Sequence, residues 1–466
     1  MTTTATRPST TRHQPACTAA ADAPLLPVVG GELRVPLATG GTARYANLDY
    51  AASAPALEQV AARVAEALPY YSSVHRGAGW PSQVSTRVYE AARVQVARFL
   101  GARPDDVLVF TRNTTDALNL LARAVPHDAG DVLVLDAEHH ANLLPWRRRA
   151  HRCVQVASTL ERTIDALEAE LAAGGVALLA VTGASNVTGE ELPVERLAEL
   201  AHRYGARIAV DAAQLAPHRD IDLAASGIDY LALSGHKIYA PYGAGVLVGR
   251  RDWLDAAEPY LAGGGAVTTV TGDSTDWAPA PQRHEGGTPN VLGALALAAA
   301  CVAVASLPPG AREVHESALR EHLVDGLRQV DGVRVQRIWA DSPSSIGVVT
   351  FTVHGWEAGL VAAVLSAEHG IGVRDGKFCA HPLLQRMGLG AGALRASLGL
   401  GSRAEDVDRL LAALRSLVEQ GPRLDYHLVD GRWAPVDDSR TAPAWLDGLV
   451  ASTGSSPCEQ TRQPIR

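Results

Sequence analysis

The stretch Tyr230-Leu-Ala-Leu-Ser-Gly-His-Lys-Ile-Tyr-Ala-Pro-Tyr-Gly-Ala-Gly-Val-Leu-Val-Gly249 places a lysine in a turn between two apolar runs. Residues 230–233 and 244–248 are long enough for buried strands, and the Gly- and Pro-rich segment between them predicts a turn. Lys237 lies in that turn, next to His236. A desolvated lysine has a lowered pKa and can form a Schiff base. The turn therefore holds a candidate nucleophile, and a surface lysine in a hairpin is the alternative that this stretch alone leaves open.

The segment before this turn alternates between apolar runs and amphipathic segments, which is the pattern of a parallel α/β sheet. Together with the two runs around Lys237, these runs make about seven strands. We therefore expect an α/β fold with a doubly wound, mostly parallel sheet. The predicted strands span 107–110, 131–135, 154–157, 176–182 and 207–211, and the predicted helices span 114–124, 142–150, 163–173 and 194–204.

Composition divides the chain into four parts. Residues 1–32 begin with a segment rich in Thr, Ala and Pro that lacks the apolar core of a signal peptide, so we expect a disordered tail. Residues 33–306 form the predicted large domain, although its first residues could pack with the smaller one. Residues 307–420 are expected to form a smaller α+β domain. Residues 421–466 are expected to be an extension, ordered near residues 426–429 and disordered after about residue 452.

Charge and cysteine content exclude several classes of protein. A net charge of −8 gives no basic surface for nucleic acid, and no apolar run is long enough to span a membrane. The five cysteines are scattered, without a Cys-x-x-Cys pair, which argues against disulfide frameworks and zinc ribbons. We therefore expect a cytoplasmic protein without a metal.

Polar residues follow the predicted strands at their carboxyl ends, where open α/β sheets gather functional groups. Thr114 and Thr115 open a helix, so they either cap it or present its N-terminus to a phosphate. His139 could stack on a ring or bind a metal, and Asn186 could bind a ligand or cap a turn. Asp211 ends an apolar strand, so it needs a partner, either a salt bridge or a cationic ring nitrogen.

A lysine, an acid, threonines and a histidine together are the groups that bind pyridoxal phosphate. Over about residues 45–420 the chain resembles the class V aminotransferase fold, and within it the SufS or NifS-like cysteine desulfurases. The matching stretches, in order, are Thr-Arg-Asn-Thr-Thr-Asp-Ala-Leu-Asn119, Glu-His-His-Ala-Asn-Leu-Leu-Pro-Trp146, Ser-Asn-Val-Thr-Gly189, Val-Asp-Ala-Ala-Gln214, Ser-Gly-His-Lys237 and Glu-Gly-Gly-Thr-Pro-Asn290.

The resemblance implies a pyridoxal-phosphate-dependent transferase of fold type I and a role for each matching residue. Lys237 would bind the cofactor covalently and move the α-proton of the substrate. Asp211 would pair with the ring nitrogen, and His139 would stack on the ring. Thr288 resembles the residue that reaches the phosphate of the neighbouring subunit, which implies a homodimer. The remaining residues expected at the phosphate or the ring hydroxyl are Thr114, Thr115, Asn186, Gln214, Ser234 and His236.

The resemblance also implies a substrate and a nucleophile. Arg395 resembles the arginine that binds the substrate carboxylate, and we add Arg374 and Asn186 to the predicted substrate site. Cys379 falls on the position of the nucleophilic cysteine, although an incidental small residue is the alternative. The implied reaction converts L-cysteine to L-alanine and passes the sulfur to a persulfide on Cys379, and then to an acceptor.

Two departures from the family pattern lie on the substrate side. The family commonly has Arg-Gly-Ile-His where this chain has Arg76-Gly-Ala-Gly79, and it commonly has Gly-His-His before the nucleophile, where this chain has Asp375-Gly-Lys-Phe378. These changes motivate an alternative on the same scaffold, namely a C–S lyase, selenocysteine lyase, epimerase or aminotransferase. A protein that binds the cofactor without catalysis is the alternative from a different class.

Overall fold

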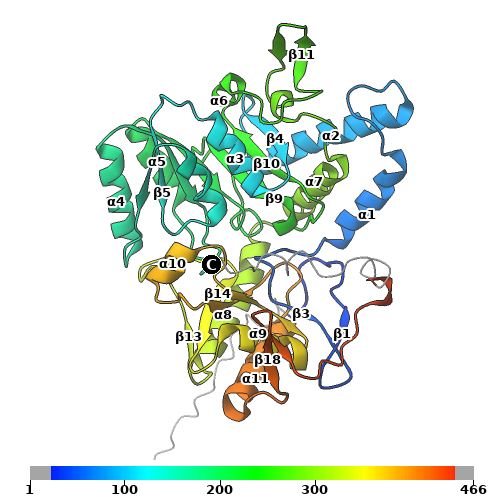
Figure 1. The fold of residues 1–466 in the computed structure, drawn as a ribbon, viewed down its shortest axis with the longest axis vertical. Helices are drawn as coiled ribbons and strands as arrows, with labels where there is room; N and C mark the ends of the chain where they lie inside the picture. The colour runs from blue at the N-terminus through cyan, green and yellow to red at the C-terminus, as the bar shows by residue number, and fades with distance from the viewer. Residues whose placement is uncertain (1–21, 447–466) are drawn as a thin grey trace, which may run out of the picture.

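The computed structural model describes residues 22–446 (Figure 1). A seven-stranded sheet with its helices fills the upper part of the view, and a four-stranded sheet lies below it. The larger sheet has the order β4-β10-β9-β8-β7-β5-β6. Only β10 pairs antiparallel with its neighbours, so the predicted mostly parallel sheet is confirmed. Its strands are β4 Val107–Thr111, β5 Asp131–Leu135, β6 His151–Val154, β7 Val176–Thr182, β8 Arg207–Asp211, β9 Tyr230–Ser234 and β10 Gly245–Gly249.

The central strands of this sheet are buried along nearly their whole length. Strands β7, β9 and β10 are buried at every residue, as expected for strands covered on both faces. Helix α7 (Val291–Ala305) is apolar on nearly every side and packs against α1 (Glu58–Ala67) and α2 (Trp80–Phe99). The other elements of this half are η2 Leu68–Tyr70, α3 Thr114–Ala124, α4 Leu160–Ala172, α5 Val194–Arg203, η5 Gly235–Lys237, α6 Arg251–Ala256, β11 Val267–Val270, β12 Thr275–Trp277 and η6 Gln282–His284.

One predicted helix is wrong. The segment 142–150, expected to be helical, contains two short 3-10 helices, η3 (His140–Asn142) and η4 (Pro145–Arg148), of which η3 begins before the segment. Pro145 has no N–H to donate to a helical ladder, so a continuous helix through it would lose a hydrogen bond. The strand expected at 154–157 is also displaced, because β6 ends at the first residue of that range.

The four-stranded sheet has the order β13-β14-β17-β16 and is antiparallel throughout. Its helices α8, α9 and α11 bury a separate apolar cluster with it. The short strand β3 (Ala46–Asn47), from near the start of the chain, pairs in parallel with β15 (Ile371–Gly372). The elements of this half are α8 Ala311–Arg328, β13 Val333–Val335, β14 Val348–Val353, α9 Ala358–His369, β16 Arg374–Gly376, α10 His381–Arg386, β17 Ala393–Ser397 and α11 Ala404–Gln420.

Both ends of the described chain make contacts with the folded body. In the segment 22–32, which we assigned to the tail, the N–H groups of Leu25 and Leu26 donate to the carbonyl of Leu400. After α11, β18 (Tyr426–Val429) and β19 (Arg432–Pro435) form a hairpin that packs on α9.

The remaining short elements are β1 Arg34–Pro36, β2 Thr42–Arg44 and η7 Ala444–Leu446. The disorder predicted after about residue 452 falls outside the described residues. Within 22–446, no helix is both long and apolar enough to cross a membrane.

Candidate active site

A cavity of about 430 Å³ lies at the carboxyl ends of the parallel strands, between the two sheets. It brings together every predicted site residue except Thr288, which is exposed in the loop before α7. The cavity thus joins side chains that are up to 281 residues apart in sequence. The predicted residues that line it are Thr114, Thr115, His139, Asn186, Asp211, Gln214, Ser234, His236, Lys237, Arg374, Cys379 and Arg395.

Lys237 ends the short helix η5, directly after β9. Gly235 makes this turn possible, because a side chain there would lie 2.7 Å from the carbonyl oxygen of Ala244. Burial lowers the pKa of Lys237 to about 8, and the nearby carboxylate of Asp211 partly opposes that change. An amine with this pKa has a much larger neutral fraction near physiological pH than an ordinary lysine, and the neutral amine is the form that makes a Schiff base.

Asp211 is the last residue of β8 and is buried. Its Oδ1 accepts a hydrogen bond from the N–H of Ala213 at 2.9 Å. Burial raises the pKa of Asp211, while Lys237 acts in the opposite direction. A buried carboxyl of this kind, facing a cavity, is suited to a cationic partner such as a protonated ring nitrogen.

The N-terminus of α3 and the end of β9 form a hydroxyl-rich corner of the cavity. Asn113 caps α3 by accepting the N–H of Asp116 at 2.9 Å. The Oγ of Ser234 accepts the N–H of Thr114 at 2.8 Å and lies 2.7 Å from the Thr114 hydroxyl. Thr115 follows on the same helix, so a helix N-terminus and several hydroxyls converge there. This combination suits a phosphate group.

His139 lies at the end of β5 with its ring orientation fixed. Its Nδ1 accepts the N–H of Ala141 at 3.0 Å, so Nε2 carries the hydrogen of the neutral ring. Burial, followed by the charge of Lys237, lowers the pKa of His139 to about 3. A neutral, immobilised imidazole in the cavity fits the predicted stacking role.

Gln214 and Asn186 line the cavity, but their side-chain amides already have partners. Gln214 Nε2 donates to the carbonyl of Ala51 at 2.8 Å. Asn186 Nδ2 donates to the carbonyl of Phe378 at 2.7 Å, so this amide holds the loop that carries Cys379. The structure therefore gives Asn186 a contact that its predicted role at the ring hydroxyl did not include.

Arg395 projects from β17 and is only 3% exposed. Its Nη1 donates to the backbone carbonyl of Asn186 at 2.8 Å, and its Nη2 donates to Asp49 Oδ1 at 3.2 Å. Arg374 Nε lies 3.4 Å from the other oxygen of Asp49. Burial lowers the pKa of Arg395 to about 10, with Asp49 opposing. Among the described residues, no group accepts a hydrogen bond from its buried Nε. The guanidinium lines the cavity, where it could pair with a ligand carboxylate.

Cys379 lies in the loop between β16 and α10, and it is exposed. Phe378 and Cys379 have left-handed backbone conformations, with φ of 50° and 52°. Such conformations cost non-glycine residues roughly 1–2 kcal/mol each, so contacts must hold the loop. The N–H of His140 donates to the carbonyl of Cys379 at 2.9 Å, and the Asn186 amide holds Phe378.

Two acidic residues that contact residues of the cavity, Asp49 and Glu138, were not among the predicted site residues. Asp49 pairs with both cavity arginines, Arg374 and Arg395, and lies in a segment where the sequence analysis placed no site residue. Glu138 was noted only as the neighbour of His139, yet it is buried, and its carboxylate accepts hydrogen bonds from the Thr182 N–H (3.0 Å) and the Asn142 amide (2.7 Å). Burial raises the pKa of Glu138 to about 8. Asp49 follows β3 and Glu138 follows β5. An acidic residue shortly after a strand is the sequence signal that could have identified each of them.

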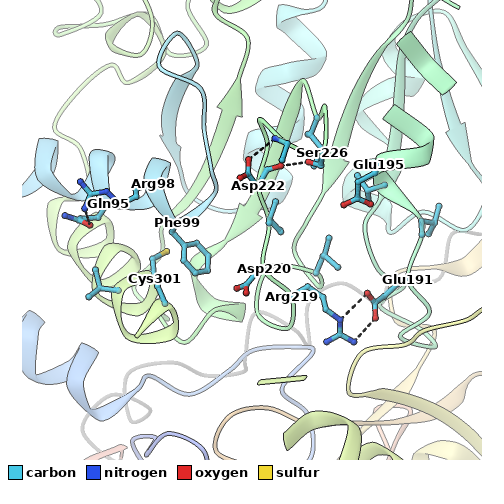
Figure 2. Close-up of a pocket in the computed structure, with 18 residues that line it drawn as sticks. Gln95, Arg98, Phe99, Glu191, Glu195, Arg219, Asp220, Asp222, Ser226 and Cys301 are labelled. Atoms are coloured by element: carbon cyan, nitrogen blue, oxygen red, sulfur yellow. Dashed lines mark hydrogen bonds and ion pairs between the residues drawn. The ribbon is translucent and has the colours of Figure 1, made fainter. Parts of the chain in front are cut away.

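A second, larger cavity of about 760 Å³ lies between α2, α7 and the segment that joins β8 to β9 (Figure 2). Two of its charged side chains, Arg219 and Glu191, are paired with each other at 2.7 Å, as Figure 2 shows. Its cysteine, Cys301, is buried, and burial raises the pKa of that thiol. No group of His, Cys, Asp or Glu within 22–446 is arranged to hold a metal ion. Reactive groups are therefore concentrated in the smaller cavity.

One family model matches a range of residues that includes both sheets. The model of the Aminotransferase class-V family matches residues 46–410. The chain is 40% identical over 365 residues to the Probable cysteine desulfurase 2 of Mycobacterium leprae (strain TN), covering 74% of this chain and 85% of that protein. It is 37% identical over 383 residues to the Cysteine desulfurase of Klebsiella pneumoniae (strain 342), covering 80% and 93%.

Solved structures show the same similarity. The cysteine desulfurase CsdA from Escherichia coli superposes with a TM-score of 0.71 at 34% identity, over 80% of this chain and 95% of that one. The apo structure of the cysteine desulfurase from Thermococcus onnurineus NA1 gives a TM-score of 0.74 at 34% identity, with the same coverage. The family match ends before the β18–β19 hairpin.

Proposed function

Because this chain belongs to the aminotransferase class-V family, we propose that it is a pyridoxal-phosphate-dependent cysteine desulfurase. The reaction would convert L-cysteine to L-alanine and transfer the sulfur to Cys379, and from there to an acceptor. The observation that carries this proposal is the single cavity that holds Lys237, Arg395 and Cys379 together.

The residues of the cavity fit the cofactor. Lys237 would hold it covalently, Asp211 would pair with its ring nitrogen, and His139 would cover its ring. When bound, pyridoxal phosphate supplies an electron sink conjugated to the α-carbon of the substrate. The buried carboxyl of Asp211, which lines the cavity, and the hydroxyl corner support this assignment, because they offer an anion for the ring and donors for the phosphate. The residues proposed at the phosphate are Thr114, Thr115, Ser234 and His236.

Lys237 and Arg395 have separate tasks toward the substrate. The guanidinium of Arg395, which lines the cavity, would bind the carboxylate. Arg374 is close by, because both arginines pair with Asp49. Lys237 Nζ, with a pKa of about 8, can take a proton from the α-carbon and return one. The two residues therefore fix the amino acid and exchange its protons.

Cys379 would act as the nucleophile. Its thiolate attacks the sulfur of the bound cysteine and forms an S–S bond, while the C–S bond breaks and its electron pair remains on the substrate carbon. Protonation of that carbon completes alanine. The loop position of Cys379 supports this role, because the thiol is exposed and lines the cavity, near the charges of Lys237 and Arg395.

A homodimer is part of the proposal. Thr288 lies outside the cavity of its own chain and is exposed in a Gly-Gly-Thr-Pro-Asn loop, which supports a role at the phosphate site of a second copy.

We also propose a cytoplasmic location, because the scattered cysteines suit a reducing compartment.

A second candidate is a C–S lyase that eliminates sulfide without a persulfide. The observation that favours it is the absence of histidine next to the thiol on the N-terminal side, where Lys377 and Phe378 stand. The nearby His140 and His381 do not line the cavity, and their rings contact each other with centroids 4.6 Å apart.

The deciding experiment incubates the holoenzyme and its Cys379→Ala variant with L-cysteine and added thiol. Equal amounts of alanine and sulfide, lost in the variant, support the desulfurase. Pyruvate formed equally by both proteins would replace the desulfurase with the lyase.

A further inference from the structure

We propose that Phe378 is a positioning residue that ties Arg395 to Cys379 and so sets the distance between the site for the substrate carboxylate and the attacking thiol. The inference rests on the proposed function, because it assigns the substrate carboxylate to Arg395 and the nucleophile to Cys379. Phe378 is also the residue at which this chain departs from the family pattern next to the thiol.

The first contact is between the Phe378 ring and the guanidinium of Arg395. The Cζ atom of Arg395 lies 5.2 Å from the ring centroid. Both side chains are buried, with exposures of 8% and 3%. A cation over a desolvated aromatic face is stabilised more than one at an exposed site. The ring therefore covers one side of Arg395 and helps to fix the orientation of its guanidinium.

The second contact closes a triangle through Asn186. Arg395 Nη1 donates to the backbone carbonyl of Asn186, and Asn186 Nδ2 donates to the backbone carbonyl of Phe378, at 2.8 and 2.7 Å. With the ring contact, each of the three residues contacts the other two. Movement of Phe378 must therefore be transmitted to Arg395, or one of these contacts must break.

The third contact extends the constraint to the nucleophile. Phe378 and Cys379 are consecutive left-handed residues, and the carbonyl of Cys379 accepts the N–H of His140. The Phe378 ring also packs in the apolar cluster of the seven-stranded sheet, together with Ala380. A loop that projects from the smaller sheet is thus anchored on the larger one. The backbone that carries the thiol is therefore held in place relative to Arg395.

This separation gives Phe378 a role in selecting substrates. An amino acid bound through its carboxylate at Arg395 can present sulfur to Cys379 only if its side chain spans the remaining distance. Phe378 acts through its two neighbours and need not touch the substrate.

The test compares Phe378→Leu with Phe378→Tyr in the holoenzyme. Leucine keeps a buried apolar side chain but removes the aromatic face, whereas tyrosine keeps the face. Two readouts are measured. The first is the dissociation constant of L-alanine, followed by the absorbance of the bound cofactor, which reports on the carboxylate site. The second is the rate of Cys379 alkylation by iodoacetamide, followed by peptide mass, which reports on the loop.

For Phe378→Leu we expect L-alanine to bind about tenfold more weakly, the scale of a buried cation–aromatic contact. We also expect Cys379 to be alkylated several-fold faster, and KM for L-cysteine to rise as kcat falls. Phe378→Tyr should stay within about twofold of the parent. The matched control is Phe110→Leu, because Arg93 Cζ lies 5.0 Å from the Phe110 ring centroid and Phe110 does not line the cavity. This control should change neither readout.

A Phe378→Leu protein that unfolds at a lower temperature, with both readouts unchanged, would overturn the inference and leave Phe378 with a packing role only. If leucine prevents folding, Phe378→Met is measured against the same two criteria. If the parent does not turn over L-cysteine but both readouts move as expected, the proposed function fails and the positioning role stands.

Discussion

The two walls of the cavity are built in different ways. The sheet wall, formed by Thr114, His139, Asp211, Ser234 and Lys237, consists of residues at strand ends and at the start of a helix. The loop wall, formed by Phe378 and Cys379, projects from the smaller half in a backbone conformation that non-glycine residues avoid. The backbone of the larger sheet fixes the sheet wall, whereas long-range contacts fix the loop wall. A site can therefore keep its cofactor chemistry constant while its substrate side changes.

The largest expected effect comes from replacing Lys237 in the sheet wall, because the proposed sulfur transfer at the loop wall also depends on the cofactor that this lysine would bind. Lys237→Ala should lower turnover of L-cysteine by about 10³-fold or more, because the covalent anchor and the proton carrier are lost together. The protein should also lack the yellow absorbance band that borohydride removes. Turnover at the parental rate would contradict the proposed function altogether.

A substitution in the loop wall should lower alanine formation without changing cofactor binding, which the sheet wall provides. Cys379→Ala should lower alanine formation by at least about 100-fold, since no thiol accepts the sulfur. The absorbance band of the cofactor should stay as in the parent, because Cys379 does not contribute to holding it. A variant that loses the band as well would show that the walls are not independent, and titration with pyridoxal phosphate measures this directly.

A smaller loss of turnover is expected when a substitution in the sheet wall removes only the negative charge of Asp211. Asp211→Asn keeps the size of the side chain but removes the anion expected at the ring nitrogen, so turnover should fall by about 10²-fold. Because Asp211 raises the pKa of Lys237, the variant should also lower that pKa further. The rate of cofactor uptake, followed by absorbance against pH, should then shift to lower pH. A shift to higher pH is the opposite result.

The pH dependence of the parent tests the same wall without a substitution. In the proposed function, neutral Lys237 is the form that would attack the cofactor aldehyde, and this form predominates above a pKa of about 8. Uptake of pyridoxal phosphate by the apoprotein should therefore rise about tenfold between pH 7 and pH 9 and then level off. A rate that still rises steeply at pH 10 would indicate a lysine with an ordinary pKa, outside the buried setting described above.

The smallest effect is expected in the second cavity. Cys301→Ala should leave turnover within about twofold and lower the free energy of unfolding by about 1 kcal/mol, because it removes only a buried sulfur atom. Urea unfolding and the L-cysteine assay on one preparation measure both quantities. A large loss of activity would mean that this cavity is coupled to the first.

The sequence predicted the sheet wall well, for a physical reason. Strand ends such as Asp211 and helix starts such as Thr114 are local features, and the rule for open sheets places them at one edge. In the structure, these residues line one cavity. Their chemical roles remain predictions that the experiments above address.

The loop wall was less predictable. Nothing local in Lys377-Phe378 indicates a left-handed turn, because that conformation depends on Asn186 and His140, each more than 180 residues away in the chain. Asp49 was missed for the same reason, since its partners Arg374 and Arg395 lie in the last quarter of the chain. The wrongly predicted helix at 142–150 is a different kind of error, because Pro145, which interrupts helical hydrogen bonding, can be read directly from the sequence.

The parallel pairing of β3 with β15 has a consequence for how the protein folds. Ala46 and Ile371 are more than 300 residues apart, yet their strands are adjacent. During synthesis β3 must wait until more than 300 further residues have emerged before it finds its partner, and contacts of such long range slow folding. A fragment that begins after α7 would expose the backbone edge of β15 to other chains. The smaller half is therefore expected to fold last and to aggregate when produced alone.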